Sequence, residues 1–573
     1  MLLKEYVVHI LKRERIPYVF MVPGGVLGPI SFEMFNDPDI TPVIAAHEGG
    51  AAFMADGYSR SSNHFGVCAA IGGPGITNMV TAIMTAKMDC TPLLVLSGDV
   101  PVPVQGKGFL QDSSFFSFDI FSILDSITSS QAAIHEVDQL TNNIEQLLAK
   151  MFDPASRGPV HISLPLDIQN KNVNSNLYNN IDKHILSPKY ADDNAISEAF
   201  SMLSESRRIV IFAGKEVRFS RSWEILTKFA EKYKIPVATT ITGKGSISEY
   251  HELSLGVLGW VTNPYAQNII LEDDIDVLLC IGTELKASDT ITWSKKFNPK
   301  KIIVNYTSLA NIFHSRRYDL EILSDTFSFI TKMLTIENEQ SSALLQSAEY
   351  RLNWLNNKKE ISNNINFFNP DNLNSDGIPI HPARLIKELR AVMPQNTVLV
   401  GDSGAHMLFG LHYWTVTDPT QIMTSLDYTG PMGWAIPASI GSSFALPDRP
   451  HVCLTGDGCM LMHGIEIKTA VQYKQPIIFI VCNNRAFGNP RLRAEYIGEK
   501  EAGFMDILPY DYAMFARSLG AEGFTVEQPE QLKSVIENAY KLNTTVLIDV
   551  IVDNVPTPTE IFDGYFFQRF GKE

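Results

Sequence analysis

Residues 451–484 read HVCLTGDGCMLMHGIEIKTAVQYKQPIIFIVCNN and carry the pattern that decides the fold. A first apolar strand is predicted over Val452–Thr455 and runs into Gly456-Asp457-Gly458. A helix of about three turns is expected next, before a second apolar strand over Ile477–Cys482 that runs into Asn483-Asn484. A strand–helix–strand unit of this length makes two parallel strands in one sheet.

Asp457 and Asn484 therefore both lie at carboxyl ends of parallel strands, where open α/β sheets bind ligands. One carboxylate and one amide oxygen suit a hard divalent cation such as Mg²⁺ or Ca²⁺. Gly456 and Gly458 allow backbone N–H groups to approach a phosphate at the start of the helix. The segment predicts a diphosphate site bridged by a metal ion, although Gly-Asp-Gly alone also occurs in hairpin turns.

A second informative segment spans residues 47–60, HEGGAAFMADGYSR. Thr41–Ala46 is predicted as an apolar strand, so Glu48 follows the strand end and begins a helix. The small residues of this helix favour close packing against another element. In isolation, Glu48 is better explained as a surface carboxylate that complements the helix dipole, whereas the metal motif in the same chain favours a functional role.

The composition is that of a globular protein with several domains. The chain has 573 residues, which is too long for a single hydrophobic core. Of these residues, 45% are hydrophobic and 19% are charged, as is usual for globular proteins. Its net charge of −16 argues against general nucleic-acid binding. Six cysteines are scattered without a CxxC pair, and we expect buried free thiols in a reducing compartment. Neither a signal peptide nor a membrane-spanning run is evident, so a cytoplasmic location is expected.

Alternating strand and helix patterns favour the α/β class, with three doubly wound parallel-sheet domains. Two Asn-rich stretches, near 168–192 and 355–380, are expected to be exposed connections. They divide the chain into domains at 1–167, 193–340 and 381–555, with a C-terminal tail at 556–573. A site that needs both Glu48 and Asp457 must form between domains, within one chain or across a dimer.

Together the two segments resemble the thiamine-diphosphate-dependent enzymes, and the resemblance covers nearly the whole chain. The branch most similar to this chain is that of the acetolactate synthase large catalytic subunits. Residues 73–78, GPGITN, are similar to its GPGATN turn, and residues 430–433, GPMG, to its GTMG. The resemblance implies a pyrimidine-binding N-terminal domain, a middle domain and a C-terminal domain that binds diphosphate and Mg²⁺.

The same resemblance assigns roles to individual residues. Glu48 would be catalytic by relaying a proton of the aminopyrimidine ring, and Gln111 would face the substrate. The implied cofactor contacts are Pro74, Asn78, Gly404, Ala405, His406, Gly430, Met432, Gly456, Asp457, Gly458, Cys459, Asn484 and Ala486, with Mg²⁺ held by Asp457, Asn484 and the Ala486 carbonyl. The family also implies a homodimer or homotetramer.

Two departures from the branch bear on substrate and cofactor. Residues 487–496, FGNPRLRAEY, lack the Trp that selects the second keto acid in this branch, so the acceptor stays open. FAD-binding relatives often carry an I-D-I-D-like segment, whereas residues 302–305 read IIVN, and we expect no bound FAD.

The function expected from the resemblance is a thiamine-diphosphate-dependent carboligase or decarboxylase that acts on pyruvate or a related 2-keto acid. Two alternatives stay open: a carbon–carbon lyase or diketone hydrolase with the same cofactor, and an inactive, cofactor-binding regulatory subunit. The presence of Glu48 argues against the inactive subunit, because such a protein has no use for the proton relay.

Overall fold

The computed structural model describes residues 1–173, 178, 190–308, 317–361, 365–426, 428–496, 498–499 and 503–558. These residues form three α/β units, each built on a six-stranded sheet whose strands are all parallel. The predicted class of three doubly wound parallel-sheet domains is confirmed. Most of the C-terminal tail, 559–573, lies outside the described residues.

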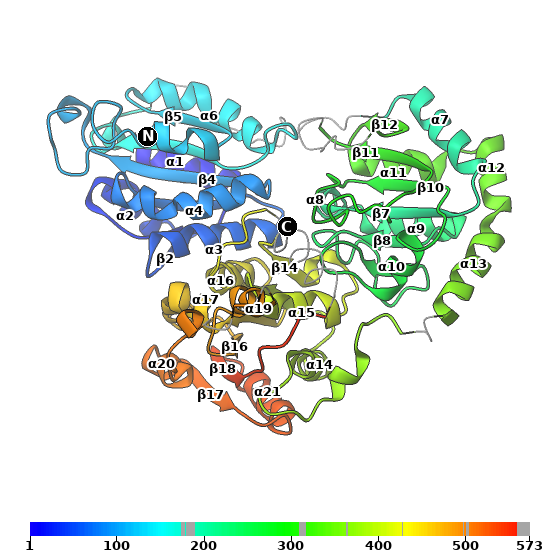
Figure 1. Cartoon of the computed structure of the whole chain (residues 1–573). Helices are drawn as coiled ribbons and strands as arrows, with labels where there is room; N and C mark the ends of the chain where they lie inside the picture. Colours follow the sequence, from blue (N-terminus) through cyan, green and yellow to red (C-terminus); the bar gives the residue numbers. More distant parts are fainter. Residues whose placement is uncertain are drawn as a thin grey trace.

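The N-terminal unit is drawn in blue and cyan in Figure 1, with strand order β2-β1-β3-β4-β6-β5. Its strands are β1 (Tyr18–Met21), β2 (Thr41–Ile44), β3 (Gly66–Ile71), β4 (Leu93–Asp99), β5 (Ser130–Ala133) and β6 (Val160–Pro165). The helices on its faces are α1 (Leu3–Arg13), α2 (Gly28–Asn36), α3 (Glu48–Ser61), α4 (Pro74–Met88), α5 (Ile120–Leu124) and α6 (Val137–Phe152).

The middle unit, green in Figure 1, has strand order β12-β11-β10-β7-β8-β9. Its strands are β7 (Ile209–Ala213), β8 (Val237–Thr239), β9 (Ser254–Val257), β10 (Val277–Ile281), β11 (Lys301–Tyr306) and β12 (Leu320–Leu323). Its helices are α7 (Asp193–Ser204), α8 (Lys215–Phe219), α9 (Trp223–Tyr233), α10 (Pro264–Ile270), α11 (Thr326–Thr335), α12 (Glu339–Gln346) and α13 (Ala348–Ile361). Residues 355–361, expected in an exposed connection, instead complete α13, where Leu355 is buried.

The C-terminal unit, yellow to red, has strand order β14-β13-β15-β16-β18-β17. Its strands are β13 (Val398–Gly401), β14 (Ile422–Thr424), β15 (His451–Gly456), β16 (Ile477–Asn483), β17 (Glu522–Val526) and β18 (Val546–Ile551). Its helices are α14 (Pro382–Val392), α15 (Ala405–Tyr413), α16 (Ala435–Ala445), α17 (Asp457–His463), α18 (Ile467–Gln472), α19 (Gly488–Tyr496), α20 (Tyr512–Ser518) and α21 (Gln531–Leu542).

The helix predicted after Gly458 differs from expectation. It is divided into α17 and α18 by a 3₁₀ turn at Gly464–Glu466. Leu461 in α17 and Ile465 in the 3₁₀ turn are 52% and 41% exposed. In this turn the Glu466 side chain points toward the N-terminal unit, where it contacts the backbone of Ala46 and His47. Local sequence patterns do not predict this contact.

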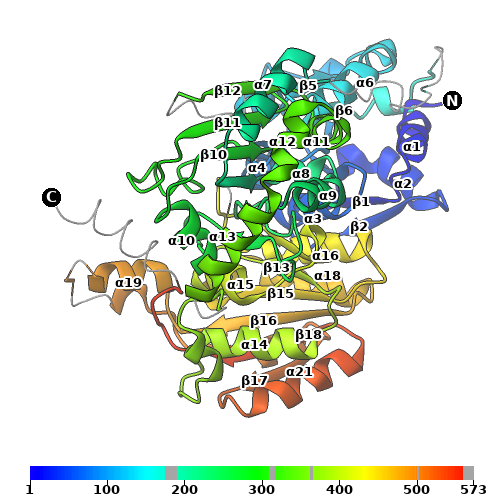
Figure 2. The same cartoon turned by 90° about the vertical axis from the view of Figure 1, so that its right-hand side faces the viewer.

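The N- and C-terminal units pack through helices α3 and α16, which lie together in both views (Figures 1 and 2). A Cβ at Gly57 would lie 2.1 Å from the Ala438 carbonyl oxygen, and one at Gly441 would lie 1.8 Å from the Met54 carbonyl oxygen. The two backbones therefore touch. The close packing expected for the small residues of α3 is observed, and its partner is a helix of the C-terminal unit.

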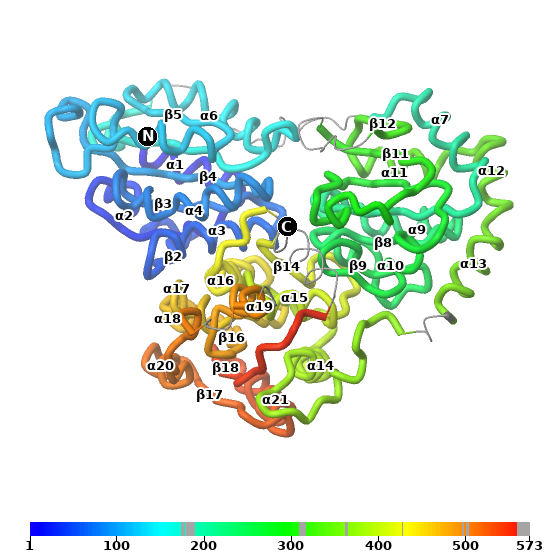
Figure 3. The backbone as a smooth tube through the Cα atoms, viewed as in Figure 1, coloured from blue at the N-terminus to red at the C-terminus, as the bar shows by residue number. Residues whose placement is uncertain are grey.

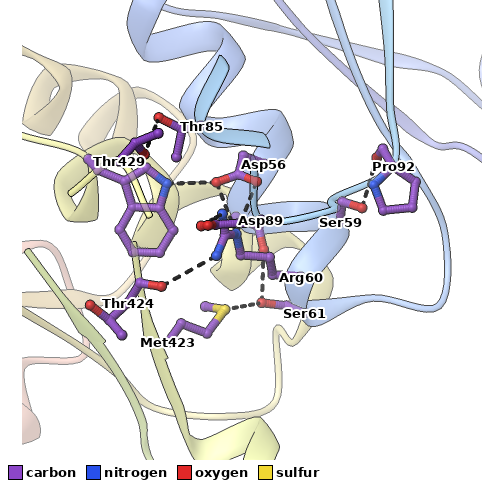
Figure 4. Close-up of polar contacts among 12 residues, drawn as sticks. Asp56, Ser59, Arg60, Ser61, Thr85, Asp89, Pro92, Met423, Thr424 and Thr429 are labelled. Atoms are coloured by element: carbon purple, nitrogen blue, oxygen red, sulfur yellow. Dashed lines mark hydrogen bonds and ion pairs between the residues drawn. The ribbon is translucent and has the colours of Figure 1, made fainter. Parts of the chain in front are cut away.

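A buried polar network joins the same two units at the end of α3 (Figure 4). Arg60 forms ion pairs with Asp56 at 3.0 Å and Asp89 at 2.6 Å, and donates a 3.3 Å hydrogen bond to the carbonyl of Thr424 in β14. Ser61 donates a hydrogen bond of 2.8 Å to Ser442 in α16. These contacts fix the helix that begins at Glu48 against the C-terminal sheet.

The path of the backbone in Figure 3 takes the chain from the N-terminal unit through the middle unit before it returns to α16.

Free thiols are buried at five of the six cysteines, and Cys90 is partly exposed. Among the described residues, no helix is both long and apolar enough to cross a bilayer.

Candidate functional site

A cavity of about 310 Å³ opens at the carboxyl ends of the C-terminal strands. β13 is followed by β14 toward one edge of the sheet, and β15 is followed by β16 toward the other edge, so the strand order reverses between the neighbours β13 and β15. Such a switch point is where doubly wound sheets bind ligands, and the volume suits a small ligand. Residues after β13 and residues after β15 both line this cavity.

All of the site residues predicted for the C-terminal unit line this one cavity: Gly404, Ala405, His406, Gly430, Met432, Gly456, Asp457, Gly458, Cys459, Asn484 and Ala486. They come from four separate stretches of the chain. The predicted residues of the N-terminal unit, Glu48, Pro74, Asn78 and Gln111, are not part of the lining.

Asp457 and Asn484 lie side by side on a shared backbone amide. The N–H of Ala486 donates to Asp457 Oδ2 and to Asn484 Oδ1, at 3.2 Å each, while the N–H of Gly458 donates to Asp457 Oδ1 at 2.8 Å. Burial raises the pKa of Asp457 to about 6. A divalent cation would offset this cost of burying a carboxylate, and these oxygen donors fit Mg²⁺.

Two glycines of the lining, Gly404 and Gly458, stand where the backbone leaves little or no room for a side chain. Gly404 has a φ of +155°, and a Cβ there would lie 2.5 Å from His406 Cε1. A Cβ at Gly458 would lie 3.0 Å from the Phe487 ring and 3.1 Å from Met432 Cε. Side chains are thus excluded from the places where a phosphate would approach main-chain N–H groups, at the start of α17.

His406 borders the same cavity with an unusual environment. Burial lowers its pKa to about 4, so the ring is neutral at physiological pH. Its Nε2 atom is buried and has no hydrogen-bond partner within the described part of the chain. A buried polar atom of this kind fits a site that a polar ligand completes.

The N-terminal site residues form a separate group. Glu48 begins α3, and its Oε2 accepts a 2.9 Å hydrogen bond from Asn78 Nδ2 in α4. Pro74 begins α4, after Gly73 at a φ of +64°. Gln111 has a φ of +63°, and its Cα would lie 4.0 Å from a Cβ at Gly73. The structure brings these four predicted residues together on one edge of the N-terminal sheet.

Several lining residues were not predicted. Asn554, which follows β18, accepts a 3.0 Å hydrogen bond from Asn484 Nδ2 and so orients the predicted metal ligand. Asp553 and Val555 line the cavity beside it. The signal available in the sequence was the position of residues 553–555 after the apolar run 546–551, another strand end at the same edge of the sheet.

Comparison with known proteins agrees with this geometry. Three family models match: "Thiamine pyrophosphate enzyme, N-terminal TPP binding domain" over residues 1–120, the central domain over 196–333 and the C-terminal TPP binding domain over 402–550. The acetolactate synthase large subunit of Buchnera aphidicola (subsp. Acyrthosiphon pisum) is 30% identical, with 96% of this chain and 94% of that protein covered.

Two further relatives extend the comparison. The probable acetolactate synthase large subunit of Methanococcus aeolicus is 29% identical over 96% of this chain and 92% of its own length. The acetolactate synthase isozyme 3 large subunit of Escherichia coli K12 is 27% identical over 96% of this chain and 94% of its own. With three matching domains and relatives that align along almost its full length, the chain belongs to the thiamine pyrophosphate enzyme family.

Proposed function

We propose that this enzyme removes CO₂ from pyruvate or a related 2-keto acid and joins the remaining two-carbon unit to a second carbonyl compound. With pyruvate as both donor and acceptor, two pyruvates give one acetolactate and one CO₂, so one carbon–carbon bond breaks and one forms. The observation that carries the proposal is the convergence of the C-terminal site residues on a single cavity at the switch point. The names of the relatives, acetolactate synthase large subunits, support this substrate class.

The C-terminal cavity would hold the diphosphate end of the cofactor. Asp457, Asn484 and the Ala486 carbonyl would bind Mg²⁺, and the backbone around Gly404, Ala405, His406, Gly456, Gly458 and Cys459 would contact the diphosphate. The Gly430 carbonyl and Met432 would contact the aminopyrimidine. When bound, thiamine diphosphate supplies the cationic ring that stabilises the carbanion left by loss of CO₂.

Glu48 would hold and move a proton at the aminopyrimidine ring. Its carboxylate is aligned by Asn78, and Pro74 and Gln111 lie at the neighbouring edge, where Gln111 would face the substrate. Because none of these four lines the cavity of its own chain, we propose that they act at the cavity of a second copy. The active unit is then a homodimer or a larger homo-oligomer.

Exposed apolar side chains support such an assembly. They lie in the N-terminal unit at Phe32, Phe35, Phe109, Leu110, Phe115, Phe116 and Phe118, and in the C-terminal unit at Leu461, Met462, Ile465, Phe504, Leu508, Tyr510, Met514 and Phe515. Contiguous exposed apolar side chains mark interaction surfaces in folded proteins, and within the first group the rings of Phe115 and Phe116 contact each other with centroids 5.6 Å apart. Both groups belong to the two units that carry the site residues.

We also propose that no FAD is bound. The switch point of the middle sheet lies between β10 and β7, and the loops after these strands hold a buried ion pair. Lys215 Nζ lies 2.8 Å from Glu284 Oε1, and the Tyr428 hydroxyl donates a 2.6 Å hydrogen bond to Glu284 Oε2. This ion pair links the two loops at the point where a dinucleotide would bind, which supports the proposal.

Product analysis tests the proposed function. The protein is incubated with pyruvate, Mg²⁺ and thiamine diphosphate, with and without added aldehydes or a second 2-keto acid. A 2-hydroxy ketone or acetolactate formed together with CO₂ supports the carboligase. Free aldehyde as the only product would indicate a decarboxylase, and cleavage of a diketone would indicate a hydrolase. If none of these compounds is turned over, the protein is an inactive subunit.

A further inference from the structure

The turn that leads into Glu48 is held by a carboxylate from the other end of the chain. The backbone N–H of Ala46 donates to Glu466 Oε2, and that of His47 donates to Glu466 Oε1, at 3.0 Å each. Ala46 and His47 are the two residues directly before Glu48. Glu466 lies in the 3₁₀ turn between α17 and α18, in the segment that begins with Asp457.

The Glu466 carboxylate is itself firmly held. It is fully buried, and Thr469 Oγ1 donates a 2.8 Å hydrogen bond to its Oε2. A Cβ at Gly50 would lie 2.0 Å from Glu466 Oε1, so a residue other than glycine would displace the carboxylate. The contact is thus built from both sides, by an acceptor with fixed geometry and by a helix start that leaves room for it.

His463, one turn earlier in the same segment, makes a second contact with the start of α3. A Cβ at Gly49 would lie 3.3 Å from His463 Nε2, and the His463 ring packs edge-on against Phe53 with centroids 5.4 Å apart. On its other side, a Cβ at Gly433 would lie 2.7 Å from His463 Nδ1. The His463 side chain, at the end of α17, therefore lies between the start of α3 and the loop that carries Met432.

We propose that Glu466 is a positioning residue for Glu48: its two hydrogen bonds to the amides of Ala46 and His47 fix where α3 begins and hence where the Glu48 carboxylate points. The inference rests on the proposed role of Glu48. A proton relay depends on distance, and a displacement of 1 Å in a catalytic group costs on the order of 10²-fold in rate. Glu466 acts through the backbone and touches neither cofactor nor substrate.

Glu466→Gln tests the inference, because the side chain keeps its size while one acceptor oxygen becomes an NH₂ group that faces a backbone N–H. The matched control is Tyr473→Phe. The Tyr473 hydroxyl accepts from the N–H of Ile44 at 2.8 Å and donates to the Pro42 carbonyl at 3.0 Å, so it anchors the same strand to the same unit farther from Glu48.

Two readouts are measured, one at saturating thiamine diphosphate and Mg²⁺ and the other in the protein without cofactor. The first is exchange of the thiazolium C2 proton with deuterated water, a step that needs no substrate. The second is amide hydrogen exchange at residues 45–48 without cofactor. We expect Glu466→Gln to slow C2 exchange by on the order of 10²-fold, with cofactor affinity within a few-fold of wild type and amide protection lost at residues 46 and 47.

Wild-type C2 exchange in Glu466→Gln would overturn the inference, and so would equal slowing in Tyr473→Phe, since that result would indicate general loosening of the interface. If Glu466→Gln does not fold, Thr469→Val removes only the bond that Thr469 donates to the carboxylate and should slow exchange to a smaller degree; no slowing overturns the inference. Glu48→Gln is run beside them. If it leaves C2 exchange unchanged, the proposed role of Glu48 fails; if it alone slows exchange, only the positioning role fails.

Discussion

Trp434, the residue directly before α16, donates a 2.6 Å hydrogen bond from its Nε1 to Asp56 Oδ2 in α3, and both side chains are fully buried. Asp56 also pairs with Arg60 (Figure 4). The Arg60 guanidinium lies over the Trp434 ring, 5.1 Å from its centroid. One aromatic residue thus closes a charged network across the two units that carry the proposed site.

Trp434→Phe should lower stability by about 1–3 kcal/mol, since the buried Asp56 carboxylate loses a donor that nothing replaces. Trp414→Phe is the matched control: Trp414 is equally buried, and its Nε1 has no hydrogen-bond partner among the described residues. Thermal unfolding of both variants measures the difference. Equal losses would show that ring volume alone explains the effect.

Asp457→Ala should abolish binding of thiamine diphosphate with Mg²⁺, because the cation loses its only carboxylate ligand. Titration calorimetry measures this directly. Asp549→Asn serves as the control, since Asp549 lies in β18 of the same sheet, accepts a 3.0 Å hydrogen bond from Asn483 and is absent from the cavity lining. Wild-type affinity in Asp457→Ala would contradict the metal assignment.

Glu48→Gln should fold and bind the cofactor with at most a small loss, because the amide can still form a hydrogen bond. It cannot relay a proton, and turnover should fall on the order of 10²–10⁴-fold. Asn78→Ala, which removes the 2.9 Å hydrogen bond to Glu48, should cause a smaller loss. Steady-state rates at saturating cofactor compare the two, and unchanged turnover in Glu48→Gln would reject its assignment.

The protein should sediment at least as a dimer. Phe116→Asp places a charge on a side chain that is 74% exposed in the single chain, and it should weaken both association and activity. Phe327→Asp, at an exposed position of α11 in the middle unit, is the control. Sedimentation velocity over a range of concentrations decides the matter; a monomer with full activity would exclude the shared site.

Acid should destabilise the fold through its buried histidines. Burial lowers the pKa of His412 to about 3, and its Nε2 accepts a 2.9 Å hydrogen bond from the N–H of Phe368, so the folded state keeps the ring neutral. The unfolded chain takes up a proton near pH 6.5 and the folded one does not. Stability is therefore full above pH 6.5 and falls by about 1.4 kcal/mol per pH unit below it, down to the folded pKa.

His412→Gln tests this pH dependence, since glutamine retains an acceptor but does not titrate. The variant should lose less melting temperature between pH 7 and pH 5 than the wild type does. Identical losses would mean that other groups carry the acid sensitivity.

Local sequence patterns predicted the strand ends that carry Asp457, Asn484 and Glu48, because a strand, a turn and a helix start are encoded by adjacent residues. They did not predict the partners of those elements. Glu466 reads as an ordinary helical glutamate, and its contact with Ala46 and His47 depends on residues about 420 positions away. The 3₁₀ turn after α17 was not predicted for the same reason, since it carries Glu466 and its distant contact.

The backbone contact between α3 and α16 also bears on how the chain is made. The N-terminal sheet is complete once β6 has been synthesised, but Ala435, where α16 begins, is translated roughly 370 residues after α3 ends. During that interval α4 and the N-terminal sheet cover one side of α3, but the side that packs on α16 has no partner. A nascent chain of this enzyme therefore exposes an apolar helix surface while the middle unit is being translated. Premature termination at this stage should yield fragments that aggregate and depend on chaperones.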